Sequence, residues 1–154
     1  MKRVIILAGF ILLLAFTNCT KNKDVSLYHP FGGLVWHRFD IIKFKIPVKR
    51  NETIYDLSLF ARVTRSFEYE NLDFNMIMTT LSGEERIKEY HLNAKKKSGE
   101  FYGEWKNDTC EISIPLKTEL KLADDVLMIQ IENLIPRLET GSIAGVGIRL
   151  HPIR

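Results

Sequence analysis

Hydrophobic and polar residues alternate with a period of two along most of this chain, a pattern that predicts β-strands. A strand that packs one side on a core and turns the other side toward solvent shows this alternation. The clearest example covers residues 55–64, with apolar residues at Tyr55, Leu57, Leu59, Ala61 and Val63. The same reasoning predicts further strands at residues 25–29, 36–46, 74–80, 86–92, 100–106, 111–116, 126–134 and 144–150.

Three segments carry additional local signals. Hydrophobic positions change parity at Ile41 and Ile42, which predicts either a bulge or a strand that crosses from one packed region to another. Residues 117–125 are the only stretch in which we expect a helical turn, and their polar composition suits a connection between sheets. Gly145 and Gly147 share one face of the last strand, so we expect another backbone to approach closely there.

Turn-forming residues separate the predicted strands at intervals of roughly 8–12 residues, the spacing found in all-β sandwiches and barrels. Strands do not alternate with long helical patterns, which argues against a doubly wound parallel sheet. The sequence therefore predicts an all-β fold over residues 25–154. We expect a single β-sandwich, jelly-roll or Ig-like, of about eight or nine antiparallel strands.

The amino-terminal segment has a different pattern. Lys2 and Arg3 precede thirteen uncharged residues, 4–16, and a short polar break then ends at Cys19. This run is shorter than the roughly 20 apolar residues of a membrane-spanning helix, and its composition is typical of a secretory signal. Because it ends on a cysteine, the segment resembles a bacterial lipoprotein signal. We therefore expect removal of residues 1–18, acyl chains such as palmitate on Cys19, and a short tether over residues 19–24.

Other kinds of processing stay open for this segment. The triplet Phe16-Thr17-Asn18 departs from the usual Leu, small residue, then Gly or Ala before the cysteine. Secretion with cleavage elsewhere and an uncleaved membrane anchor are the alternatives. The residues after Cys19 lack the acidic cluster that resembles a surface-export tag in some envelope lipoproteins. We therefore expect the domain to face the inside of the envelope.

Charge and cysteine content exclude some classes of function. The formal net charge of the 154 residues is +3, and removal of Lys2 and Arg3 with the signal would leave +1. Basic residues are interspersed with acidic ones, which argues against a nucleic-acid partner. The one basic run, residues 95–97, is interpreted as a solvated turn. If Cys19 is lipidated, Cys110 has no cysteine partner, and we expect it to be a buried thiol in a strand.

Residue types that could perform catalysis are present but not in a useful spacing. The four histidines, His29, His37, His91 and His151, include no pair at the i, i+4 spacing of a helical zinc motif. Adjacent acids at positions 84–85 and 124–125 would point to opposite faces of a strand, so neither pair forms a two-carboxylate site. The sequence therefore predicts no catalytic residue, no metal site and no cofactor.

Aromatic residues raise one binding hypothesis. Trp36, Tyr102 and Trp105 are candidates to face a ligand, and together with Phe39, Tyr69 and Phe101 they could form a platform on which sugars stack. The alternative is ordinary packing in the core and at strand edges, the role of most aromatic residues on strands.

A family resemblance extends over nearly the whole predicted domain. The residues that carry it are Trp36, Asp40, Phe44, Arg65, Tyr69, Asn71, Leu72, Gly99, Gly103, Trp105, Gln130, Ile143, Gly145, Gly147, Ile148 and Arg149. In their order and spacing, behind a lipoprotein signal, the chain resembles the gliding-motility lipoprotein family GldH of the Bacteroidota. It departs from that family after Gln130, where a Met-Arg pair is usual. The resemblance implies an outer-membrane lipoprotein required for gliding, without a recognised enzymatic activity.

Two functional hypotheses follow. The first is a non-catalytic envelope lipoprotein that binds protein partners in a motility or secretion apparatus and is held to the membrane by lipidated Cys19. Its candidate interaction residues are Arg65, Tyr69 and Asn71, in a segment between two strands where binding function often lies; alternatively, Arg65 and Asn71 satisfy backbone groups at a strand crossover. The second is a lipoprotein that binds glycans or another small ligand through its aromatic strand face.

Overall fold

The computed structural model describes residues 24–49 and 53–153 of the chain. The predicted signal peptide, Cys19 and the tether before Asp24 lie outside these residues. Within the part that is described, no helix is long and apolar enough to cross a membrane.

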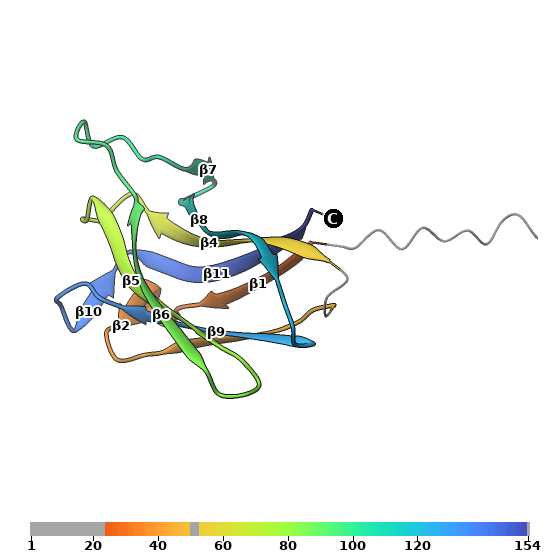
Figure 1. Ribbon diagram of the computed structural model, residues 1–154. Helices are drawn as coiled ribbons and strands as arrows, with labels where there is room; N and C mark the ends of the chain where they lie inside the picture. The colour runs from red at the N-terminus through yellow and green to blue at the C-terminus, as the bar shows by residue number, and fades with distance from the viewer. Residues whose placement is uncertain (1–23, 50–52, 154) are drawn as a thin grey trace, which may run out of the picture.

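Antiparallel strands form two main sheets that pack as a β-sandwich (Figure 1). The five-stranded sheet has the order β1 (Val25–Pro30), β11 (Ile143–Pro152), β4 (Ile54–Thr64), β8 (Thr109–Lys121), β7 (Glu104–Lys106). The four-stranded sheet has the order β3 (Ile42–Pro47), β9 (Val126–Asn133), β5 (Asn71–Thr79), β6 (Glu85–Asn93). A small sheet pairs β10 (Glu139–Gly141) with β2 (Val35–His37), which follows the 3₁₀ turn η2 (Gly32–Leu34). The all-β sandwich is thus confirmed, with eleven strands in the described residues instead of eight or nine.

The core lies between the two main sheets, and β4 supplies its central row. Tyr55, Leu57, Leu59, Ala61 and Val63 are all buried, as the alternation predicts. The facing sheet contributes buried side chains from all four of its strands: Ile42, Phe44, Ile46, Leu72, Phe74, Met76, Tyr90, Leu92, Leu127, Ile129 and Ile131. Burial of apolar area contributes roughly 25 cal/mol per Å², so this interleaved layer is the main source of stability.

The segment predicted as one strand over residues 36–46 is two strands in two different sheets. β2 pairs with β10, whereas β3 pairs with β9 in the four-stranded sheet. Ile41 is exposed and Ile42 is buried, so the parity change marks the passage of the chain from one sheet to the other. Of the two predicted explanations, the crossing between packed regions is correct.

The helical turn predicted for residues 117–125 is wrong, because β8 continues through Pro115 to Lys121. Its pairing with β4 shifts register twice, between Tyr55 and Leu57 and between Leu57 and Ser58. Each shift inserts an extra residue into β8 and changes which side chains face the core. Leu116 and Leu120 are both buried, and their spacing of four residues fits one face of a helix as well as one face of a strand.

The glycines of β11 confirm the predicted close approach. The backbone of β1 pairs with β11 along this stretch, with Tyr28 opposite Gly147 and Pro30 opposite Gly145. A Cβ atom on Gly147 would lie 2.5 Å from the carbonyl oxygen of Leu27 and 2.3 Å from Cζ of Phe60. Both distances are shorter than any ordinary van der Waals contact, so this face of β11 has no room for a side chain at Gly147.

We expect Gly147→Ala to lower the free energy of unfolding by roughly 1–3 kcal/mol, the usual cost of overpacking. Gly141→Ala is the matched control, because a Cβ atom there would meet no atom within 4 Å. Denaturant unfolding of both variants and the unsubstituted protein measures the effect. Equal losses of stability in the two variants would contradict the assignment of Gly147 to a crowded contact.

Candidate functional site

Two connections between the main sheets meet at one end of the sandwich. Residues 65–70 join β4 to β5, and residues 94–103 join β6 to β7, so each connection crosses from one sheet to the other. The backbone N–H groups of Ala94 and Lys95 both donate to the carbonyl oxygen of Glu70, at 2.7 and 3.0 Å. The Lys95 ammonium group also donates to the carbonyl oxygen of Phe67. These bonds hold the two connections together as one surface.

Three cationic side chains of this surface each lie over an aromatic ring. Cζ of Arg65 is 4.2 Å from the centre of the Trp105 ring, Nζ of Lys95 is 4.8 Å from that of Phe101, and Nζ of Lys96 is 5.8 Å from that of Tyr102. A cation within about 6 Å of a ring centre is attracted by the negative face of the ring. We name these six residues the cation–aromatic cluster.

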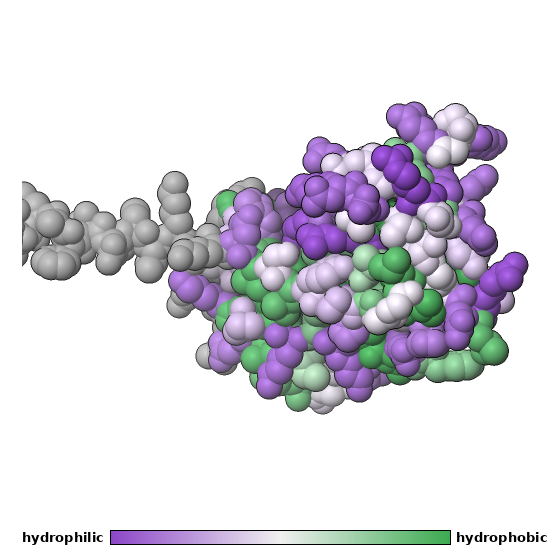
Figure 2. Space-filling model, turned by 180° about the vertical axis from the view of Figure 1, so that it is seen from behind, coloured by the Kyte–Doolittle hydropathy of each residue, from purple (hydrophilic) through white to green (hydrophobic). Residues whose placement is uncertain are grey.

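Residues 94–103 protrude from the sandwich as a narrow loop (Figure 1). An isolated bridge pairs Lys95 with Phe101, and the turn between them contains Gly99 at a φ of 85°. Nζ of Lys96 lies 2.7 Å from Oε2 of Glu100, and this hydrogen bond to a carboxylate raises the pKa of Lys96. Tyr102 is 57% exposed, so its ring is available at the surface. The view from behind shows mainly hydrophilic residues on this protruding part (Figure 2).

The structure brings together some of the residues that the sequence singles out. Arg65 and Trp105 lie together in the cation–aromatic cluster, although Arg65 is in the β4–β5 connection and Trp105 is in β7. Tyr102 belongs to the same cluster through its contact with Lys96. Tyr69 is half-buried and packs its ring edge-on against Phe67, with 5.5 Å between the ring centres. Asn71 is exposed at the first position of β5.

Trp36 lies apart from the cluster, in β2 of the small sheet. Its side chain is fully buried and stacks on Phe31 at 5.2 Å between ring centres. Its indole N–H donates to the carbonyl oxygen of Asp40 at 3.0 Å. The ring therefore packs in the core and presents no face to solvent.

Sequence reasoning missed the role of Lys95. The basic run 95–97 does form the predicted turn, but Lys95 is half-buried and contacts both Phe101 and Phe67. The available signal was the position of Lys95 and Phe101 on either side of Gly99, a spacing that suits a small hairpin. The strand predicted at residues 100–106 is correspondingly shorter, since β7 begins only at Glu104.

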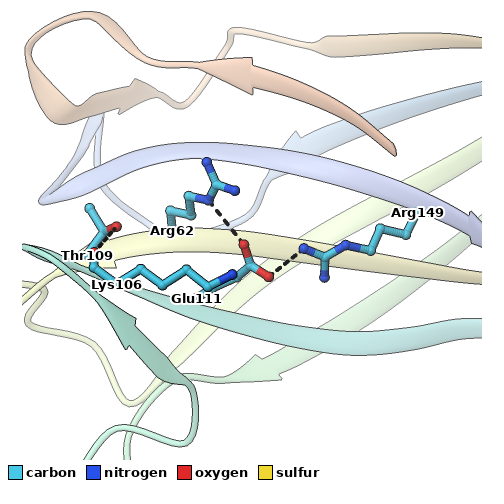
Figure 3. Close-up of polar contacts among 5 residues, drawn as sticks. All are labelled: Arg62, Lys106, Thr109, Glu111 and Arg149. Atoms are coloured by element: carbon cyan, nitrogen blue, oxygen red, sulfur yellow. Dashed lines mark hydrogen bonds and ion pairs between the residues drawn. The ribbon is translucent and has the colours of Figure 1, made fainter. Parts of the chain in front are cut away.

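A second group of polar residues covers the outer face of the five-stranded sheet (Figure 3). Glu111 of β8 accepts from Nε of Arg62 at 3.1 Å and from Nη2 of Arg149 at 2.5 Å. Phe60 lies beneath them and is only 1% exposed, with Cζ of Arg149 at 4.0 Å from its ring centre. Tyr28 stacks on the other side of Phe60 at 5.9 Å between ring centres. Phe60 and Tyr28 thus form a small apolar cluster outside the main core, which we name the satellite core. The salt bridges of Glu111 with Arg62 and Arg149, which we name the Arg–Glu–Arg bridge, cover it.

Burial and nearby charge shift the pKa of Glu111 in opposite directions. Burial alone would raise the pKa of Glu111, but hydrogen bonds and charge attraction from Arg149 and Arg62 together hold its pKa below the usual value. The carboxylate is therefore ionised and fully paired near neutral pH. Its geometry supports a structural role, because both of its oxygen atoms are already bonded.

Other groups that could perform chemistry are scattered. Residues 24–49 and 53–153 contain no group of three or more His, Cys, Asp or Glu side chains that could hold a metal ion. Cys110 is a free, fully buried thiol, as predicted, and burial raises its pKa. A raised pKa keeps the thiol protonated, and a protonated thiol is a poor nucleophile.

We expect Glu111→Gln to lower the free energy of unfolding at neutral pH by roughly 1–3 kcal/mol, because two guanidinium groups lose their charged partner. Since the folded pKa of Glu111 lies below the reference value of 4.5, its contribution is present above pH 4.5 and is lost as the pH falls through the folded pKa. The difference in stability between the two proteins should therefore shrink as the pH falls below 4.5. Denaturant unfolding at several pH values between neutral and below 4.5 tests this prediction, with Glu85→Gln as an exposed control. A stability difference that stays constant with pH would contradict it.

Comparison with solved structures finds only a distant likeness. Two structures of the tobacco streak virus coat protein, a dimer at 2.4 Å and a C2 crystal form at 2.1 Å, each match with 15% sequence identity and a TM-score of 0.27. Each match covers 88% of this chain and 90% of the coat protein. A TM-score this low supports no argument about function.

The comparison with protein families identifies the family of this chain. No curated protein matches this chain. The model of the GldH lipoprotein family matches residues 25–150, from the first residue of β1 almost to the end of β11. This range contains both connections of the cation–aromatic cluster and the Arg–Glu–Arg bridge. The chain therefore belongs to the GldH lipoprotein family.

Proposed function

We propose that this protein is a non-catalytic lipoprotein of the outer membrane, anchored through lipidated Cys19 and facing the periplasm. It acts by binding protein partners in a gliding-motility or secretion apparatus of the envelope. Membership of the GldH lipoprotein family supports the class of protein. The observation that carries the mode of action is the cation–aromatic cluster, which offers an accessible surface built from two connections and β7.

The position of the cluster suits a protein held at its amino end. Asp24 is bonded to His151, and His151 lies opposite Asp56 near the start of β4. Arg65 directly follows Thr64, the last residue of β4. The described chain thus begins at one end of the sandwich and the cluster lies at the other end, which would face away from the attached membrane.

The composition of the cluster also fits protein recognition. Interface residues that contribute most to affinity are enriched in Trp, Tyr and Arg, and binding residues concentrate on loops that a rigid scaffold positions. Arg65 and Tyr102 supply these residue types on two connections that are bonded to each other, and Trp105 supplies a third from β7, directly after the second connection. Tyr69 and Asn71 border the same surface from the β4–β5 side.

We expect Arg65→Ala and Tyr102→Ala to reduce recovery of partners about tenfold or more in a crosslinked pull-down of the full-length protein from its own envelope, the factor that 1.4 kcal/mol represents. Arg137→Ala is the matched control, since Arg137 is exposed on a different loop. Cys19→Ala should lose the partners together with membrane attachment.

Thermal unfolding of the same variants separates recognition from loop stability. If Arg65→Ala lowers the melting temperature and leaves partner recovery unchanged, the stacking of Arg65 on Trp105 has a structural role, and the protein-binding proposal fails.

Exposed aromatic rings support a second candidate function, the binding of glycans. Tyr102 is exposed, and its neighbour Phe101 packs edge-on against Trp105 at 5.2 Å between ring centres. Binding to a glycan array by the unsubstituted protein, lost in Tyr102→Ala, would favour this function over protein binding.

A further inference from the structure

The sandwich contains a cleft outside the cation–aromatic cluster. Its volume is about 660 Å³, and it lies between the β5–β6 hairpin and the bulged part of β8. Its apolar lining consists of Met76, Met78, Ile87, Tyr90, Pro115 and Leu116. The remaining lining residues are Arg86, Lys88, Lys117 and Thr118.

The cleft exists because one end of the sandwich is splayed open between two strand edges. β6 is the edge of the four-stranded sheet, and three-residue β7 pairs with β8 only as far as Glu111. Beyond that point β8 bulges, and Leu116 is the extra residue between the pairs Ser58–Pro115 and Leu57–Lys117. The hydroxyl of Tyr90 donates to the carbonyl oxygen of Leu116 at 2.7 Å, and this bond closes the inner end of the cleft.

Two cations of β6 point to the side on which core residues would otherwise lie. Arg86 and Lys88 share parity with Tyr90 and Leu92, both of which are buried. In the ladder Arg86 lies opposite Met78 and Lys88 lies opposite Met76, so cationic and thioether side chains are neighbours on one face.

The charge of the cleft has one sign. No acidic residue lines it, and the acids Glu85 and Glu89 of β6 lie on the opposite face of the strand. Arg86 is bonded to Glu84 at 3.0 Å, outside the lining. Within the described residues, neither Lys88 nor Lys117 has a salt bridge, and Lys88 lies 4.9 Å from the centre of the Tyr90 ring.

We infer that this cleft binds a single acyl chain that carries an anionic head group. Its volume falls within the range of roughly 300–1,000 Å³ that small-molecule sites occupy. Flexible methionine side chains adapt to a chain of variable shape, and Lys88 and Lys117 on either side of the opening complement an anionic head group. The head group is a carboxylate if the ligand is a free fatty acid, or a phosphate if it is a single-chain lysophospholipid of the membrane.

The place of the cleft agrees with a membrane source. Lys117 pairs with Leu57, Leu57 with Leu150, and Leu150 with Val25, so the cleft lies level with the start of β1. The argument from position rests on the anchoring through Cys19 in the proposed function. The existence of the cleft does not depend on that anchoring. A failed search for protein partners would leave the acyl-chain inference intact.

The test is photocrosslinking of the full-length protein in isolated envelope membranes, with an alkyne-tagged, photoreactive analogue of palmitic acid as the probe. We expect labelled peptides from β6 and from residues 115–118. The double variant Arg86→Glu/Lys88→Glu should reduce labelling about tenfold, the factor that 1.4 kcal/mol represents. Lys43→Glu/Lys45→Glu is the control with the same charge change, on exposed positions of β3.

A second variant makes the result independent of charge. Met78→Trp fills the cleft with a larger side chain and should also reduce labelling, while thermal unfolding confirms that the variant is folded. Competition with unlabelled palmitate indicates a free fatty acid, and competition with lysophosphatidylglycerol indicates a single-chain membrane lipid; both support the inference.

Two results would overturn it. One is labelling that maps elsewhere or is equal in all variants. The other is self-association of Arg86→Glu/Lys88→Glu with unchanged labelling, because inward-pointing charges on an edge strand also prevent pairing with a second copy. In that case the cations protect the edge of β6 and bind no ligand.

Discussion

The packing of one row of β4 side chains against the opposite sheet is the interaction on which the rest of this structure depends. β4 lies in the middle of the five-stranded sheet, and Leu59, Ala61 and Val63 are completely buried. Because two sheets share this single core, the chain must cross between them repeatedly. Two of these crossings, residues 65–70 and 94–103, meet at one end of the sandwich and form the cation–aromatic cluster together with Trp105 of β7. The surface proposed for recognition is therefore formed where the chain crosses between the two sheets that enclose the core.

The regular alternation of apolar and polar residues made most of the strands predictable. The wrong predictions fall where this alternation is interrupted. β4, β5 and β11 follow from apolar side chains that keep one parity along the strand, and β6 follows from the turn signal that precedes it. β8 has two extra residues after Pro115 that interrupt its alternation, so the buried residues Leu116 and Leu120 are separated by three exposed ones, a spacing that also fits a helix. The cleft is bounded by that irregular part of β8, so the feature that misled the sequence reasoning is also the one that opens the sandwich.

The candidate site was less predictable than the fold, because its contacts join residues that are distant in the sequence. Arg65 lies on Trp105 forty positions later, and no local pattern indicates which cation will lie over which ring. Phe60 interrupted the alternation of β4 with an apolar residue on the solvent side, a signal that could have indicated a satellite core. The glycines were predictable because the lack of a side chain at Gly145 and Gly147 has a direct steric consequence.

The pairing of β1 with β11 gives the domain the geometry of a spacer. The first described residues lie beside the last ones, since Val25 is opposite Leu150, and both are near the start of β4. β4 has eleven residues. At about 3.3 Å per residue it separates the two ends of the sandwich by about 36 Å. A chain held at its amino end would therefore present the cation–aromatic cluster at roughly this distance from the start of the domain.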